Sequence, residues 1–278
     1  MNKNKLNCFA DVPADEYHQA ARDGKFLSSH LLGDFRKAPK LYRMKMIGEI
    51  EPSESAAFTM GRAVHSLILE GRSAFEKEFL VSEGPTNPKT NEPFGKLTKA
   101  YREWAAAQSK CVISGPEFAL MTKLQQSVWT HPVAMELLDE GIAEQTVRTS
   151  YCSEPCQIRM DWFRLEYEGR TIICDLKTCE NIDWFESDAR KFGYPQQMGF
   201  YRAVLMRAIE AELGDRPVDC YLIGVEKREP YRCGVWKLSE ELLESAAREN
   251  ERAIAELQEC RSINRWPTRL EELRVLGV

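Results

Sequence analysis

The chain has 278 residues, of which 43% are hydrophobic and 29% are charged. This length fits one large domain or two small ones, and the composition is ordinary for a globular protein, which excludes disordered and collagen-like chains. The formal net charge of −5 argues against a generally basic nucleic-acid-binding surface but leaves room for a local one.

Membrane, export and metal-cluster signals are weak in this sequence. No apolar run approaches the roughly 18 residues that a membrane helix needs, and no apolar stretch of a secretory signal follows the first lysines. The nine cysteines are an odd number and include no pair with the two-residue spacing of a common metal site. We therefore expect free thiols, a cytoplasmic location and no association with a membrane.

Charge is distributed unevenly along the chain. Segment 240–259 contains seven glutamates and two arginines, so the rest of the chain is close to neutral. Segment 36–45, RKAPKLYRMK, contains five basic residues and no acid. This segment is a candidate phosphate-binding surface, and an ordinary solvated basic face is an equally open alternative.

The first half of the chain is predicted to be mainly helical. Ser28 or Ser29 caps a short helix that runs through Phe35 and ends before the next proline. Segment 54–70 has apolar residues at helical spacing, and a glycine follows it. Segment 82–96 contains three prolines and two glycines, which predicts a loop and a candidate lid or crossing arm. Further helices are expected at 98–109, 115–130 and 132–140.

The second half is predicted to contain the sheet. Strands are expected at 144–151, 156–166, 170–177, 218–226 and 232–238, and helices at 183–191, 195–213 and, after a cap at Ser239, 240–259. Glu168 and Gly169 form a tight turn, so the second and third strands make a hairpin. This order predicts an α/β or α+β class with a small mixed sheet. We expect a single domain, with a helical part at 1–142 and a sheet-containing catalytic core at 143–278.

Two aspartates of the hairpin are expected to face each other. Asp161 and Asp175 each lie seven residues from Glu168, which places them about 5 Å apart across the ladder. Side chains on a strand alternate between its two faces. In the third strand, Asp175 shares a face with Ile173 and Lys177. In the second strand, Asp161 shares a face with Gln157, Arg159 and Phe163, and the opposite face carries Ile158, Met160 and Trp162. Two facing carboxylates repel each other unless a divalent cation lies between them.

Each polar feature also has a structural alternative. In an ordinary surface hairpin, Asp161 simply pairs with Lys177 or Arg159. Gln197 and Tyr201 lie four residues apart on one helix face, where they suit either hydrogen bonding to a phosphate or lysine or the edge of a core. His65 flanks the apolar stripe of segment 54–70, and a structural histidine is more common there than a metal ligand.

Four motifs in order resemble those of the RecE-type exonucleases. They are GRAVHSLILE, CQIRMDWF, ICDLKT and PQQMGFY, and they follow the opening LSSHLLGDFRKAPKLY. RecE-type exonucleases belong to the PD-(D/E)xK nuclease superfamily, in the branch shared with RecB-like and lambda-exonuclease-like enzymes. The resemblance covers roughly 26–240. It implies an α/β restriction-endonuclease-like core, with a small central mixed β-sheet flanked by helices, plus a helical N-terminal part.

The resemblance implies a role for each matching catalytic residue. His65, Asp161 and Asp175 would bind the metal, and the Leu176 carbonyl would be a backbone ligand. Lys177 would orient or activate the attacking water and stabilise charge on the phosphate. The family's QxxxY motif matches Gln197 and Tyr201, which would position the lysine or the phosphate.

The resemblance also suggests residues that contact DNA. Ser28 and Ser29 would offer hydroxyls and a helix N-terminus to a terminal 5′-phosphate. Arg36 and Arg62 are weaker candidates for backbone phosphates. Glu144 is placed like an additional acidic residue of related nucleases.

The function implied is a metal-dependent 5′-to-3′ exodeoxyribonuclease that acts on double-stranded DNA ends and leaves 3′ single-stranded tails for recombination. Oxygen-rich ligation suits Mg2+, with Mn2+ as a substitute. Family partners are a single-strand annealing protein, in phage or prophage recombination, and further copies of the chain in a trimeric or tetrameric ring. Two alternatives stay open: a PD-(D/E)xK nuclease of other polarity or an endonuclease, and a catalytically idle DNA-binding scaffold protein.

Overall fold

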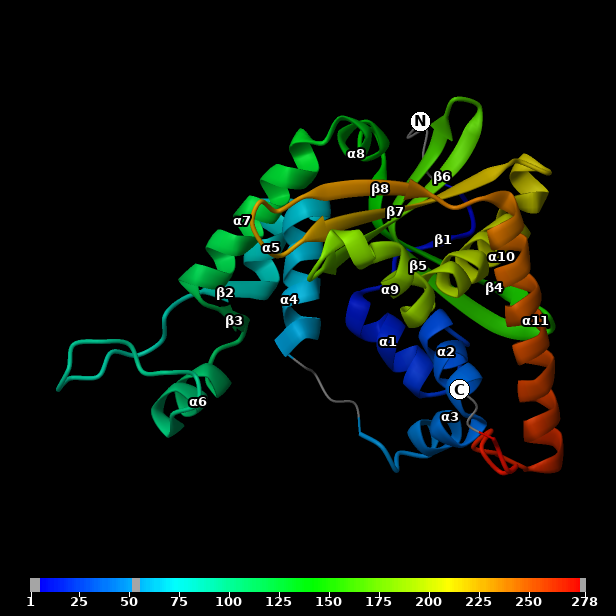
Figure 1. Ribbon diagram of the computed structural model, residues 1–278, viewed down its shortest axis with the longest axis horizontal. Helices are drawn as coiled ribbons and strands as arrows, with labels where there is room; N and C mark the ends of the chain where they lie inside the picture. Colours follow the sequence, from blue (N-terminus) through cyan, green and yellow to red (C-terminus); the bar gives the residue numbers. More distant parts are fainter. Residues whose placement is uncertain (1–5, 52–55, 276–278) are drawn as a thin grey trace.

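Figure 1 shows the computed structural model of the protein, which describes residues 6–51 and 56–275. The main sheet has six strands in the order β1-β4-β5-β6-β7-β8. These strands are β1 (Phe9–Ala10), β4 (Ile142–Tyr151), β5 (Glu154–Tyr167), β6 (Arg170–Cys179), β7 (Val218–Glu226) and β8 (Cys233–Lys237). β6 and β7 are parallel, and the other neighbouring pairs are antiparallel. The predicted mixed α/β fold is confirmed.

Helices flank this sheet, and a parallel pair of short strands, β2 (Phe79–Val81) and β3 (Cys111–Ile113), lies apart from it. The helices are α1 (Ala14–Arg22), α2 (Ser29–Lys37), α3 (Pro39–Met46), α4 (Ala56–His65), the π-helical η1 (Ser66–Glu70), α5 (Arg72–Glu78), α6 (Lys99–Ala106), α7 (Gly115–Thr130), α8 (Pro132–Leu137), the 3-10 helix η2 (Ile182–Trp184), α9 (Phe185–Phe192), α10 (Tyr194–Leu213) and α11 (Glu240–Ile263). Among the described residues, no helix is long and apolar enough to span a membrane.

The two faces of the sheet are buried in two separate hydrophobic clusters. One cluster joins strand residues such as Ile173 to α2, α10 and α11, and it includes the buried Phe35, Phe200 and Leu257. The other joins Ile172 to α4, η1 and α7, and it includes Val64, Leu67 and Leu124. Figure 1 shows α4 and α7 on the left of the molecule and the long helix α11 on the right. Because both faces are covered, the strands are held on both sides by apolar burial.

The predicted elements are recovered with small shifts at their ends. The hairpin at Glu168 is confirmed by the antiparallel pairing of β5 with β6. The predicted loop 82–96 lies between β2 and α6, and Figure 1 shows it extending from the body of the molecule. Elements that the sequence did not predict are short, and they include β1, which pairs with β4 and so brings the N-terminal part into the sheet.

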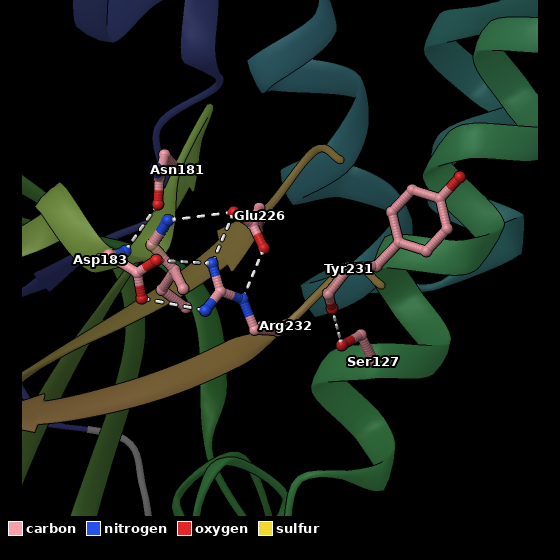
Figure 2. Close-up of polar contacts among 7 residues, drawn as sticks. Ser127, Asn181, Asp183, Glu226, Tyr231 and Arg232 are labelled. Atoms are coloured by element: carbon pink, nitrogen blue, oxygen red, sulfur yellow. Dashed lines mark hydrogen bonds and ion pairs between the residues drawn. The ribbon is translucent and has the colours of Figure 1, made fainter. Parts of the chain in front are cut away.

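A polar cluster ties the segment after β6 to the β7–β8 hairpin (Figure 2). Arg232 Nε donates to Glu226 Oε2 at 2.8 Å, and Arg232 Nη1 donates to Asp183 Oδ1 at 2.9 Å. On the other side of the hairpin, the Ser127 hydroxyl of α7 donates to the Tyr231 carbonyl. These bonds hold η2, and therefore the start of α9, against the sheet.

Candidate active site

β5 and β6 separate at the two aspartates. Backbone pairing between these strands ends at Trp162 and Cys174. Beyond that pair, β5 continues beside β4, and β6 continues beside β7. We call the opening between them the fork. Asp161 lies on its β5 side, and Asp175 and Lys177 lie on its β6 side, so the predicted register of the hairpin brings the two aspartates to one place.

Strict alternation along β5 is wrong at Asp161. Phe163, and not Trp162, packs in the same cluster as Met160, while Trp162 packs on the opposite face. Glu144 of β4 has a φ of +55°, and the pairing of β4 with β5 skips Glu144 and Asp161. A local irregularity of this kind shifts the side chains that follow it to the other face of the sheet.

Three side chains with ligand atoms converge beside the fork. One ligand atom each of His65, Glu144 and Asp161 lie within 4.8 Å of one another. His65 Nδ1 is 3.4 Å from Asp161 Oδ2, and the same oxygen accepts the backbone N–H of Leu176 at 2.9 Å. Glu144 Oε2 is 2.5 Å from Arg159 Nε. Glu144 therefore joins the predicted ligands His65 and Asp161, whereas it was expected among the residues near DNA.

The helix that carries His65 changes from α to π geometry directly after it. The sequence predicted one continuous helix over 54–70, of which residues 54 and 55 lie outside the described part. Gln125 and Trp129 of α7 donate side-chain hydrogen bonds of 2.8 and 3.1 Å to two carbonyls of the π segment. These bonds satisfy carbonyl groups near the C-terminal end of the helix, which have no partner within the helix itself. Short π segments are frequent at functional sites.

A second group of polar side chains lies on the β6 side of the fork. Asp175 is 1% exposed, and its Oδ2 is 2.5 Å from Lys177 Nζ. Gln197 Nε2 donates to Asp175 Oδ1 at 3.0 Å. Lys177 Nζ also lies 5.0 Å from the centre of the Tyr194 ring. Gln197 thus holds the aspartate beside the lysine, and Tyr201 is buried one turn further along α10.

Burial and charge shift the pKa values of these groups. Burial raises the pKa of Asp161 to about 7, and the carboxylate of Asp175 adds to this effect. Burial, together with Asp161, also raises the pKa of Glu144. For Lys177, burial acts to lower the pKa, but the carboxylates of Asp175 and Asp161 outweigh it and the pKa is raised. Burial and the Lys177 ammonium lower the pKa of His65, so its imidazole is neutral at pH 7.

These side chains fit a divalent cation. The Glu144 and Asp161 carboxylates and a neutral imidazole offer ligand atoms of the kind that Mg2+ and Mn2+ accept. Among the described residues, Asp175 Oδ2 accepts no hydrogen bond of normal geometry and has the ammonium of Lys177 beside it. A cation would offset the burial of the Asp161 carboxylate and its repulsion from Asp175, which together raise the pKa of Asp161.

The predicted serine contacts to a 5′-phosphate are not supported. Ser28 is buried at the start of α2, and its hydroxyl accepts the Leu31 N–H at 3.4 Å as a helix cap. Ser29 is also buried, and its hydroxyl has no hydrogen-bond partner among the described residues. Just before them, the Leu27 N–H donates to the Pro155 carbonyl of β5 at 2.8 Å. This segment therefore completes the edge of β5 and does not present hydroxyls at the surface.

The predicted arginines both have protein partners. Arg36 donates a hydrogen bond to Asn250 of α11, and Arg62 Nη2 lies 3.3 Å from Glu78 Oε2. Segment 36–45 is therefore partly engaged in packing between helices. Contact of these arginines with DNA stays a prediction.

Sequence reasoning missed two roles at the site. The sequence offers Arg159 as a partner of Asp161, but Arg159 pairs with Glu144. Tyr194, whose ring lies beside Lys177, is not among the predicted site residues. Its spacing of three residues before Gln197 on α10 places both on one side of the helix, and this spacing was the available signal.

Comparison with known proteins identifies the family and the fold of this chain. The family model for a PDDEXK-like domain of unknown function matches residues 28–276. No curated protein matches the chain. A crystal structure described as a "Putative exonuclease" from Eubacterium rectale is similar over 97% of this chain and 96% of that chain, with a TM-score of 0.65 and 15% sequence identity. That likeness shows a shared, restriction-endonuclease-like fold. The chain therefore belongs to the PDDEXK-like family and, with it, to the PD-(D/E)xK nuclease superfamily.

Proposed function

We propose that this protein is a metal-dependent 5′-to-3′ exodeoxyribonuclease of the RecE-like group, which acts on double-stranded DNA ends and leaves 3′ single-stranded tails for recombination. One observation carries the proposal: His65, Glu144 and Asp161 converge beside the paired Asp175 and Lys177. Membership of a nuclease superfamily supports phosphodiester hydrolysis. The polarity and the preference for duplex ends follow from the RecE-like motifs.

The chain's own residues have separable roles in this reaction. His65, Glu144 and Asp161 would hold the cation, with Asp175 on the facing strand, and Mg2+ or Mn2+ is the expected ion. Once bound, such an ion lowers the pKa of water and stabilises negative charge on the phosphate. Lys177 keeps its proton beside Asp175, so it acts as a positive hydrogen-bond donor toward the phosphate and not as a base.

We also propose the partners that the RecE-like group implies. They are a single-strand annealing protein and further copies of this chain in a trimeric or tetrameric ring around DNA. In such a ring, basic residues line the channel and the acidic face of α11 points outward. Light scattering during size-exclusion chromatography measures the mass of the particle, and a monomer at all concentrations contradicts the ring.

The function is tested with duplexes labelled at either end. Wild-type protein is titrated with Mg2+ and Mn2+ on duplexes whose 5′ or 3′ ends are blocked, with Asp175→Ala as the inactive control. We expect a block at the 5′ end to stop digestion and a block at the 3′ end to leave it unchanged. Digestion of a covalently closed circle favours an endonuclease. A wild type that is inert with both metals favours the idle scaffold.

A further inference from the structure

An exposed aromatic side chain ends α9 next to the fork. Phe192 is the last residue of α9 and is 59% exposed. Its ring centre lies 6.0 Å from that of Tyr194, with 33° between the planes. Gly193 joins the two residues with a φ of +75°, which glycine adopts without strain and which lets α9 end and α10 begin within one residue. We call Phe192 and Tyr194 the aromatic ledge.

The ledge is continuous with the catalytic groups. Lys177 Nζ lies 5.0 Å from the centre of the Tyr194 ring, and the same ammonium is paired with Asp175. At the outer end of the ledge, Lys191 Nζ lies 5.5 Å from the centre of the Phe192 ring. The ledge therefore runs from the catalytic lysine to solvent, with an ammonium group at each end.

Exposure alone does not mark a binding site, since single exposed apolar side chains are common on protein surfaces. Trp184, at the start of the same helical segment, is 64% exposed. What sets Phe192 apart is its ring contact with Tyr194, whose ring in turn contacts Lys177. The half-buried Tyr194 also packs against the buried Phe185, so packing within the fold accounts for Tyr194 but not for the exposed ring beside it.

We propose that the aromatic ledge binds an unpaired nucleobase of the substrate strand, stacked on Phe192, while the adjacent phosphate lies at Lys177. This inference rests on the proposed nuclease function and names the form of DNA that the site accepts. Aromatic rings beside basic groups bind single-stranded nucleic acid without regard to sequence, because every base has a π-face. A base inside a duplex is stacked on both sides, so it reaches the ledge only after it leaves its pair.

The test compares ends that have the same phosphates but differ in their bases. Full-length protein with Ca2+ in place of Mg2+ is titrated, by fluorescence anisotropy, with duplexes that carry a short overhang of normal or of abasic nucleotides. We expect wild type to bind the normal overhang more tightly. Phe192→Ala should weaken binding of the normal overhang about five-fold or more, with little change for the abasic one. Phe192→Tyr should retain the preference, and Trp184→Ala is the matched control.

Three outcomes overturn the inference. The first is that Phe192→Ala weakens binding of both overhangs equally, and the second is that Trp184→Ala shows the same loss as Phe192→Ala. The third outcome is a change in oligomeric mass in Phe192→Ala with an intact base preference, which assigns Phe192 to contact between copies of the chain. Cleavage of ordinary duplexes with Mg2+ is measured in parallel. A wild type that cleaves but shows no base preference contradicts only the ledge. A wild type that prefers normal overhangs but never cleaves contradicts the nuclease function and leaves base binding standing.

Discussion

The two hairpins that share β5 bring an acid to the same place from opposite sides, but these acids have different partners. The β4–β5 hairpin brings Glu144, which is paired with the guanidinium of Arg159. The β5–β6 hairpin brings Asp175, which is paired with the ammonium of Lys177. Asp161 lies between them and has the imidazole of His65 and a backbone N–H beside it.

This difference indicates which part of the site is structural and which part faces substrate. Arginine keeps its charge in all conditions and forms a fixed pair, so Arg159 holds Glu144 in place. Lysine is a compact charge that can turn toward a phosphate, and Lys177 has a ring of the aromatic ledge beside it. Burial raises the pKa of Glu144 and raises that of Asp161 to about 7, so both carboxylates gain from a bound cation.

The largest expected effect comes from the lysine of the β5–β6 hairpin. Lys177→Ala should lower Mg2+-dependent cleavage by about 10²- to 10³-fold, because it removes a positioned positive charge from the phosphate. Lys237→Ala is the matched control, since Lys237 also pairs with a strand aspartate, Asp219, at 2.6 Å but lies outside the fork. Initial rates on an end-labelled duplex measure both variants. Near wild-type activity in Lys177→Ala contradicts its role.

The acid of the β4–β5 hairpin should affect metal binding. Glu144→Gln keeps the shape of the side chain but loses its charge, so we expect Mn2+ to bind at least about ten-fold more weakly. Isothermal titration calorimetry measures the dissociation constant. The control is Glu168→Gln, at the turn of the β5–β6 hairpin. This substitution should leave the dissociation constant for Mn2+ unchanged. An unchanged dissociation constant in Glu144→Gln would mean that Glu144 does not bind the metal together with His65 and Asp161.

The acid between the hairpins should make the metal-free protein sensitive to pH. The pKa of Asp161 rises from its ordinary value of 3.8 to about 7, so the folded state binds this proton more tightly than the unfolded state does. The stabilisation that comes from this bound proton is therefore complete below pH 3.8 and is lost as the pH rises through about 7. Asp161→Asn removes this loss and should raise the melting temperature in EDTA at pH 8 by several degrees, for a gain on the order of 2 kcal/mol.

The same variant has two internal controls. The gain should shrink at pH 5, where most Asp161 is protonated in the folded wild type. Saturating Mn2+ at pH 8 should reverse the order, because only the wild type binds the ion with its full charge. Equal melting curves at pH 8 in EDTA speak against a buried, repelled carboxylate at this position.

The two hairpins also show how far the sequence predicts the site. The position of Asp175 opposite Asp161 followed from counting residues on either side of Glu168, where a glycine marks the turn. The same count about Cys152 and Ser153 places Glu144 opposite Asp161. That hairpin was not predicted because Cys-Ser lacks the Asn or Gly that turns with positive φ favour, yet these residues have φ values of 49° and 64°.

At the level of the fold, long periodic segments were predictable and local departures were not. The helix over 115–130 has the bounds that the sequence predicts. The side of β5 on which Trp162 packs depends on an irregularity in β4, and the geometry after His65 depends on hydrogen bonds from α7. Both are tertiary interactions, which a periodic pattern within one segment does not contain.

The smallest expected effect concerns the unusual turn itself. Because Cys152 and Ser153 both have positive φ, the double substitution Cys152→Asn with Ser153→Gly should stabilise the protein on the order of 1 kcal/mol by removing backbone strain. The midpoint of urea unfolding measures this gain. Cys152→Ala with Ser153→Ala, which keeps the strain, should give none. The turn sets the register in which Glu144 lies opposite Asp161. Because the substitutions keep this turn, Mn2+ affinity should stay unchanged in the stabilised variant. A weaker affinity would mean that the strained turn helps to place the acid.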